Sequence, residues 1–153
     1  MNEQKRQAIV EALTKAFNME IETAINYLAC SIALDGVRAE EIKKSLAADI
    51  PAEMGHATQL ANRIKTIGGS MVGTQALKWT QNYMQPPADT TDVVAVIKGV
   101  IVAEEEAINH YNHIIQLCDG VDYVTQDLVI TILGDEEEHR RTFQGFLKEY
   151  IKS

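Results

Sequence analysis

Residues 52–57 read AEMGHA, which places Glu53 and His56 three residues apart. The same Glu-x-x-His spacing returns near the carboxyl end of the chain at Glu136 and His139. Residues three positions apart project from the same face of an α-helix, so a carboxylate and an imidazole at this spacing can hold one ion together. The two pairs are therefore candidates for a metal site, provided that helices carry them.

Helical periodicity extends outward from both pairs. Apolar residues recur at alternating steps of three and four along four segments, at about 4–34, 38–67, 91–118 and 121–151. Ala, Leu, Ile, Glu, Lys and Gln dominate these segments, which favours helix over strand. Pro51 lies inside the second segment and should kink that helix, because it lacks the amide hydrogen. The bend could be merely tolerated, or it could aim Glu53 and His56 inward.

The connections between the segments predict their arrangement. Short breaks at Asp35-Gly36 and Asp119-Gly120 make the first two segments, and the last two, antiparallel neighbours. The middle connection, residues 68–90, can travel the length of a bundle. Thr90, Thr91 or Asp92 can cap the helix that follows. We expect one domain over residues 1–153: an all-α four-helix bundle of two antiparallel hairpins joined by a long crossover, with no fifth helix.

Composition limits the classes of function. The chain has 153 residues, 46% hydrophobic and 24% charged, and a formal net charge of −8. This charge argues against a nucleic-acid partner, since such proteins neutralise phosphates with clustered Lys and Arg. No apolar run reaches the roughly 20 residues that cross a membrane, and the first residues lack the apolar core of a signal peptide. Two cysteines are too few for a disulfide framework. We expect a cytoplasmic protein with no membrane partner.

The apolar stripes are interrupted by six polar residues that should be buried. A buried carboxylate is costly unless it is paired or binds a metal ion. Arg63 is the only basic residue near a stripe, and it lies at another level, so salt bridges cannot satisfy the four carboxylates. Divalent cations can satisfy these carboxylates. The six candidate ligands are Glu20, Glu53, His56, Glu104, Glu136 and His139.

The two halves of the sequence form a degenerate repeat. Tyr27 follows Glu20 by seven residues, and Tyr111 follows Glu104 by seven; each tyrosine precedes a turn and one of the Glu-x-x-His pairs. Two hairpins packed about a pseudo-two-fold axis would bring four glutamates and two histidines together. This is the ligand set of a carboxylate-bridged dinuclear site. Hard oxygen ligands with two imidazoles suit iron or manganese, with zinc as a competitor.

With this doubled pattern the chain resembles the ferritin-like di-iron carboxylate superfamily over nearly its full length. The run at 52–57, followed by Arg63-Ile64 and Gly68-Gly69, is similar to bacterioferritin, as is Glu20 followed by the run TAINY at 23–27. The resemblance implies that Fe(II) is oxidised by O2 or H2O2 at a di-iron ferroxidase centre within each chain. It also implies that the ferric mineral is stored in a homo-oligomeric cage, for iron storage and detoxification.

The resemblance further implies roles for single residues and two iron ions per chain. These roles are terminal carboxylates at Glu20 and Glu104, bridging carboxylates at Glu53 and Glu136, one imidazole per metal ion at His56 and His139, and carboxylate-orienting hydroxyls at Tyr27 and Tyr111. Met54 matches the methionine that in bacterioferritins binds haem b at the interface between two subunits. Alternatively, Met54 fills space at a helix or dimer contact.

Two differences from the related families leave the assembly and the function open. The chain ends about one turn after the last stripe, without room for the fifth helix of 24-subunit shells. This favours a 12-subunit, Dps-like cage or a smaller oligomer over a 24-subunit shell. The amino terminus offers only Lys5 and Arg6, too little charge to tether DNA. The alternatives to storage are a rubrerythrin-like di-iron peroxidase, although no Cys-x-x-Cys pair is present, and a Dps-like protective shell.

For the remaining polar and aromatic residues we expect structural roles outside the candidate metal site. Asp49 is expected to be a partly solvated helix residue, although it could guide iron toward the site or bind a further ion. Cys30 and Cys118 should lie toward opposite ends of the bundle, too far apart for a disulfide. Trp79 and Tyr83 should anchor the crossover on the bundle or on a neighbouring subunit. The residues expected at the solvated surface are Glu105, Glu106, His110, His113, Asp135, Glu137 and Glu138.

Overall fold

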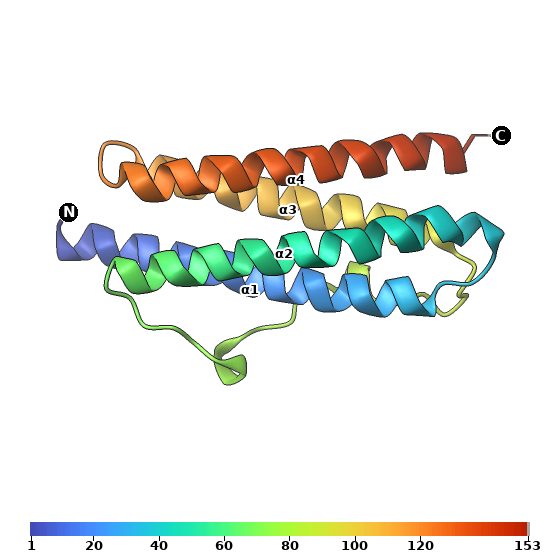
Figure 1. Ribbon diagram of the computed structural model, residues 1–153, viewed down its shortest axis with the longest axis horizontal. Helices are drawn as coiled ribbons and strands as arrows, with labels where there is room; N and C mark the ends of the chain where they lie inside the picture. The colour runs from blue at the N-terminus through green and yellow to red at the C-terminus, as the bar shows by residue number, and fades with distance from the viewer. Residues whose placement is uncertain (153) are drawn as a thin grey trace.

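Four long helices form an antiparallel bundle in the computed structural model, which describes residues 1–152 (Figure 1). They are α1 (Glu3–Ala33), α2 (Glu40–Thr66), α3 (Val93–Cys118) and α4 (Tyr123–Tyr150). Short 3₁₀ turns lie at η1 (Val37–Ala39), η2 (Thr74–Ala76) and η3 (Asn82–Met84), and the described residues contain no strand. The predicted all-α bundle of two hairpins joined by a crossover is confirmed.

Caps and turns set the helix boundaries. The side chain of Asp92 accepts a hydrogen bond from the Ala95 amide at 3.1 Å, so the cap expected among residues 90–92 is Asp92. α2 begins at Glu40 rather than near residue 38, because the preceding three residues form η1. It then continues through Pro51 to Thr66. Gly36 and Gly120 turn the two short connections with φ of 100° and 69°, values that glycine adopts without strain.

The apolar core consists of two clusters at different levels of the bundle. One cluster contains Leu34, Ile42, Ile97 and Phe143, among others, and the other contains Leu13, Leu60, Ile114 and Ile132, among others. Along every helix, the six candidate ligands fall between the residues of these two clusters. The candidate site is therefore a polar layer between two apolar layers of the bundle.

The two cysteines lie in different clusters. Cys30 is in the first cluster and Cys118 in the second, and both are buried and free, so the expected absence of a disulfide between them agrees with their positions. Within residues 1–152 no helix has the length and apolar character to cross a membrane.

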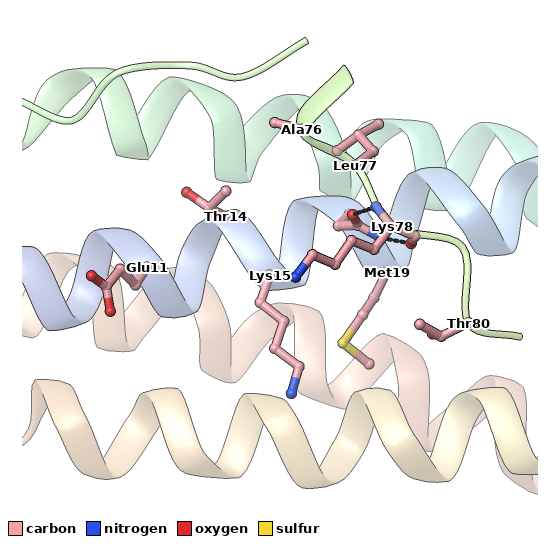
Figure 2. A pocket seen from close by; sticks show the side chains of 9 residues that line it. Glu11, Thr14, Lys15, Met19, Ala76, Leu77, Lys78 and Thr80 are labelled. Carbon is pink, nitrogen blue, oxygen red and sulfur yellow. Dashed lines mark hydrogen bonds between the residues drawn. The ribbon is translucent and has the colours of Figure 1, made fainter. Parts of the chain in front are cut away.

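The crossover runs back along the α1–α2 hairpin and is fastened to α1 (Figures 1 and 2). The buried carboxylate of Glu22 accepts hydrogen bonds from the backbone amides of Thr80 and Gln81, both at 2.7 Å. Asn18 and the backbone of Lys78 exchange two further hydrogen bonds, of 2.6 and 2.8 Å. These contacts make the crossover a fixed part of the fold, although it contains only short turns.

The end of the crossover packs closely on α3. A Cβ atom at Gly99 would lie 2.5 Å from the carbonyl oxygen of Tyr83, so glycine is required for this approach. The Tyr83 hydroxyl donates a 2.5 Å hydrogen bond to Glu106 of α3, and it therefore anchors the crossover as expected. Trp79, the other expected anchor, is 56% exposed.

Candidate metal centre

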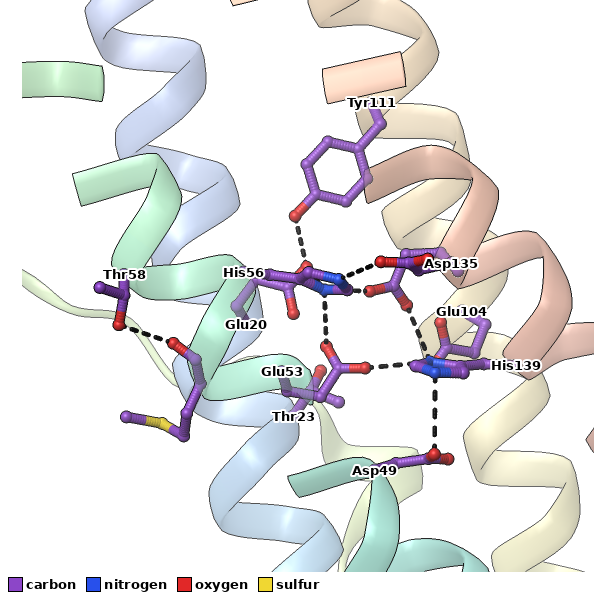
Figure 3. A network of polar contacts seen from close by, with 12 residues as sticks. Glu20, Thr23, Asp49, Glu53, His56, Thr58, Glu104, Tyr111, Asp135 and His139 are labelled. Atoms are coloured by element: carbon purple, nitrogen blue, oxygen red, sulfur yellow. Dashed lines mark hydrogen bonds and ion pairs between the residues drawn. The ribbon is translucent and has the colours of Figure 1, made fainter. Parts of the chain in front are cut away.

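Side chains from all four helices meet in the polar layer between the two apolar clusters (Figure 3). They form two overlapping groups in which one oxygen or nitrogen atom of each residue lies within 4.8 Å of those of the others. Glu53 and Glu136 belong to both groups. The first group is completed by Glu20 and His56, and the second by Glu104 and His139. The structure thus brings together all six residues singled out in the sequence.

The imidazoles point into the carboxylates. His56 Nδ1 lies 2.9 Å from an oxygen of Glu136 and 3.6 Å from an oxygen of Glu20. His139 Nδ1 lies 3.2 Å from an oxygen of Glu53 and 3.8 Å from one of Glu104. None of the four glutamates is more than 2% exposed, so water cannot replace missing partners.

Each of the six residues keeps one buried atom without a hydrogen-bond partner. In residues 1–152 these atoms are Glu20 Oε2, Glu53 Oε1, His56 Nδ1, Glu104 Oε2, Glu136 Oε1 and His139 Nδ1. Arg63, the nearest basic residue in the sequence pattern, is bound elsewhere, by Thr125 at 2.7 Å and Asp122 at 3.0 Å. A buried polar atom without a partner is costly, and an inward ring of carboxylate oxygens and imidazole nitrogens is a donor set for divalent cations. The residues therefore fit two metal ions; that they are ligands stays a prediction.

Protons hold the cluster together when no ion is bound. Burial raises the pKa of Glu53 and Glu104 well above the usual value, and neighbouring carboxylates raise it further. Burial opposes charge on His56, but its contacts with Glu136 and Glu20 raise its pKa to about 11. Burial also opposes charge on Glu136, yet its close contacts with Glu104, His139 and His56 hold its pKa below the usual range. When no metal ion is bound, the protons on Glu53, Glu104 and His56 therefore offset the negative charge of the buried carboxylates.

Two buried tyrosines connect the hairpins across the centre. The Tyr27 hydroxyl of α1 donates to Glu104 of α3 at 2.5 Å, and the Tyr111 hydroxyl of α3 donates to Glu20 of α1. Burial, followed by the nearby carboxylates, raises the pKa of both phenols well above 10, so both remain donors. Each tyrosine therefore binds one carboxylate of the opposite hairpin, and its role in orienting a metal ligand stays a prediction.

Asp135 lies closer to the site than its place in the acidic run 135–138 predicts. Its carboxylate, although 55% exposed, accepts a 2.8 Å hydrogen bond from His56 Nε2. Once the ring loses its second proton, this bond keeps the remaining proton on Nε2 and leaves the Nδ1 lone pair facing the glutamates, the orientation that a metal ion requires. Asp49 stands near His139 in a looser way, with 3.7 Å between Oδ1 and Nε2. The sequence contained one indication that Asp135 lies near the site. Asp135 directly precedes Glu136, at the edge of the stripe of residues that faces the inside of the bundle.

We expect Asp135→Ala to weaken metal binding about 10- to 100-fold, the usual effect of removing a carboxylate that orients a histidine ligand. The measurement is a Co(II) titration followed by absorbance. Asp127→Ala is the matched control, because Asp127 is an exposed aspartate of the same helix. Equal affinity for the two variants would show that the hydrogen bond to His56 does not position the ring.

Three further candidates lie outside the cluster. Met54, the candidate haem ligand, is 44% exposed on α2, and its role stays a prediction. His113 is exposed as expected. His110 was expected at the surface but is half-buried, because its Nε2 atom donates to the carbonyl oxygen of Ala12 at 2.8 Å.

Comparison with known proteins places the chain in a family. A family model described as a ferritin-like domain matches residues 10–152. A bacterioferritin from Desulfovibrio desulfuricans is 25% identical over 152 residues, covering 99% of this chain and 80% of the relative. The structure of a dodecameric thioferritin, the bacterioferritin-related protein of Bacteroides fragilis, superposes with a TM-score of 0.84 at 23% identity and covers 95% of this chain and 87% of that chain. A mutant of Dps1 from Mycobacterium smegmatis superposes with a TM-score of 0.82 at 19% identity, covering 96% and 99%. The match over residues 10–152 shows that the chain belongs to the ferritin-like domain family.

Proposed function

We propose that the chain is a ferroxidase that stores and detoxifies iron. In this proposal each chain binds two iron ions, oxidises Fe(II) with O2 or H2O2, and stores the ferric product in a homo-oligomeric cage of 12 or 24 chains in the cytoplasm. The observation that carries the proposal is the pair of overlapping ligand groups, which share Glu53 and Glu136 and leave one unpartnered buried atom on each of six residues. The bacterioferritin relative supports the activity, and the dodecameric relative supports the cage.

In this proposal, each residue of the centre has a separate role. Glu53 and Glu136 can contact both metal positions, whereas Glu20 with His56, and Glu104 with His139, can each contact one. Two adjacent ions, when bound, supply the two electrons that reduce O2 to H2O2, or H2O2 to water. The tyrosines hold the terminal carboxylates in place, and Asp135 orients His56. Preorganised ligands of this kind bind metal without rearranging the helices.

Metal content, oxidation and particle mass together test the proposal. The metal-free protein should bind two Fe(II) ions per chain without oxygen, and the ferric absorbance should then rise rapidly with O2 or H2O2. Light scattering should give the mass of a shell. A chain that binds no Fe(II), or binds it without oxidation, contradicts a ferroxidase.

The same measurements separate the alternatives. Fast turnover of H2O2 without accumulation of ferric mineral indicates a rubrerythrin-like peroxidase. A shell that assembles but oxidises no Fe(II) indicates a protective shell, a function suggested by the superposition on Dps1.

A further inference from the structure

A very small cavity lies directly over the candidate metal centre. Its volume is about 10 Å³, and all four glutamates of the centre line it. A cavity needs about 10–15 Å³ to hold one water molecule, so this one cannot admit a metal ion with its water shell. On this side of the bundle, something in the cavity wall must move before an ion can reach the carboxylates. The other wall residues are Met19, Thr23, Ala103 and Ala107.

Only one of these four side chains can change the opening by rotation. Ala103 and Ala107 have no side-chain torsion to change. The hydroxyl of Thr23 is held by a 2.8 Å hydrogen bond from Gln81, which is itself a buried residue of the crossover. Met19 is half-buried and unbranched, with three rotatable bonds, and methionine adapts readily to its surroundings.

Met19 also lines two larger cavities on the outside of the bundle. One, of about 420 Å³, lies between α1 and the crossover, and the other, of about 700 Å³, lies between α1 and α3. Figure 2 shows the Met19 side chain running from α1 toward α3. Met19 is thus shared by both solvent-facing cavities and by the small cavity over the centre.

Charge at the outer mouth does not select strongly for a cation. Lys15 lines both outer cavities, and Glu106 in the larger one accepts the hydrogen bond from Tyr83. Burial lowers the pKa of His110, so this ring is neutral at pH 7. The charges that line this side of the bundle therefore do not distinguish a cation from a neutral molecule, and the width of the opening is the remaining feature.

We propose that Met19 sets the rate at which small species reach the metal centre from the α1–α3 face. The thioether closes the cavity in the observed rotamer and opens it when the side chain rotates. Met19 precedes Glu20 in the chain but contributes no atom to either ligand group, so it should affect rate and leave the equilibrium affinity unchanged. This inference rests on the proposed function, because it requires that metal ions bind at the centre.

Stopped-flow binding of Co(II) to the metal-free protein tests the inference without any turnover. Met19→Ala should bind Co(II) faster than the wild type, and Met19→Phe about tenfold more slowly, which is the effect of ~1.4 kcal/mol of added barrier. The dissociation constant should be the same in all three proteins. Met71→Ala is the matched control, since Met71 is a methionine of the crossover that is 40% exposed and lies outside these cavities.

The outcomes separate this inference from the proposed function. A wild type that binds no Co(II) overturns both. A wild type that binds two ions, with association rates unchanged in Met19→Ala and Met19→Phe, overturns only the role of Met19. Because Met19→Ala removes a partly exposed side chain, it is expected to fold even if the bulkier phenylalanine disturbs the helix packing.

Discussion

Glu136→Ala is expected to lower the rate of Fe(II) oxidation by at least about 100-fold, beyond the 10- to 100-fold that loss of a ligand-orienting residue costs. Glu136 belongs to both groups of candidate ligands, so its removal would take a candidate ligand from both proposed metal positions. It also removes the carboxylate nearest to His56 Nδ1, at 2.9 Å. Glu53→Ala should act similarly because Glu53 is also shared, whereas His139→Ala should empty mainly one position.

The measurements for Glu136→Ala are the initial rate of ferric absorbance after oxygen is added and the metal content per chain. Glu137→Ala is the matched control, because it removes the same side chain from the next residue, which is exposed. The control should oxidise Fe(II) at the wild-type rate. A Glu136→Ala protein that still binds two ions and oxidises Fe(II) normally would rule out this cluster as the ferroxidase centre.

The metal-free protein is expected to lose stability as the pH rises from 5.5 to 8. Burial raises the pKa of Glu20, Glu53 and Glu104, so the folded chain keeps protons that the unfolded chain releases above pH 4.5. His56 adds to this trend, since its pKa rises from 6.5 to about 11 on folding. When the folded state binds more protons than the unfolded state, stability falls as pH rises. The lowered pKa of Glu136 acts oppositely, but only below about pH 4.5.

Thermal unfolding of the metal-free protein at the two pH values measures this effect. We expect the midpoint temperature to fall by about 5 °C or more, the shift that roughly 2 kcal/mol produces in a chain of this size. The double variant Glu53→Gln/Glu104→Gln keeps two neutral, hydrogen-bonding side chains at every pH, so its midpoint should fall much less. Glu137→Gln controls for a change of charge outside the cluster. Equal slopes in the wild type and the double variant would contradict the assignment of protons to these carboxylates.

Bound metal should reverse this pH dependence. Metal ions displace the protons of Glu53 and Glu104, so binding releases protons and strengthens as pH rises. The gain in midpoint temperature on adding Co(II) should therefore be larger at pH 8 than at pH 5.5.

The sequence alone predicted most of the fold and the candidate ligand set, for a physical reason. A buried stripe of period 3.6 leaves few places where a charged residue is tolerated, so Glu20 and Glu104 stand out against their apolar neighbours. The repeat of Glu-x-x-His then indicates that these charges meet at one level. Local spacing was sufficient because the position of every candidate ligand is fixed by the face of its own helix.

Contacts that depend on how separate elements pack were not predictable in the same way. Asp135 belongs to an acidic run that looks solvent-facing, and only the placement of α2 beside α4 brings it to His56. Glu22 lies off the inward stripe, and its burial depends on the path of the crossover, whose amides it binds. His110 is likewise held by a carbonyl of another helix, at Ala12.

The crossed hydrogen bonds of Tyr27 and Tyr111 have an evolutionary consequence. Each hairpin carries one glutamate, one tyrosine and one Glu-x-x-His pair, and each tyrosine binds a glutamate of the other hairpin. A single ancestral hairpin paired with its own copy would already supply every type of side chain found in the centre, in the same crossed arrangement. Gene duplication and fusion would then have needed to add only a connecting segment, and the crossover fastened by Glu22 occupies that position.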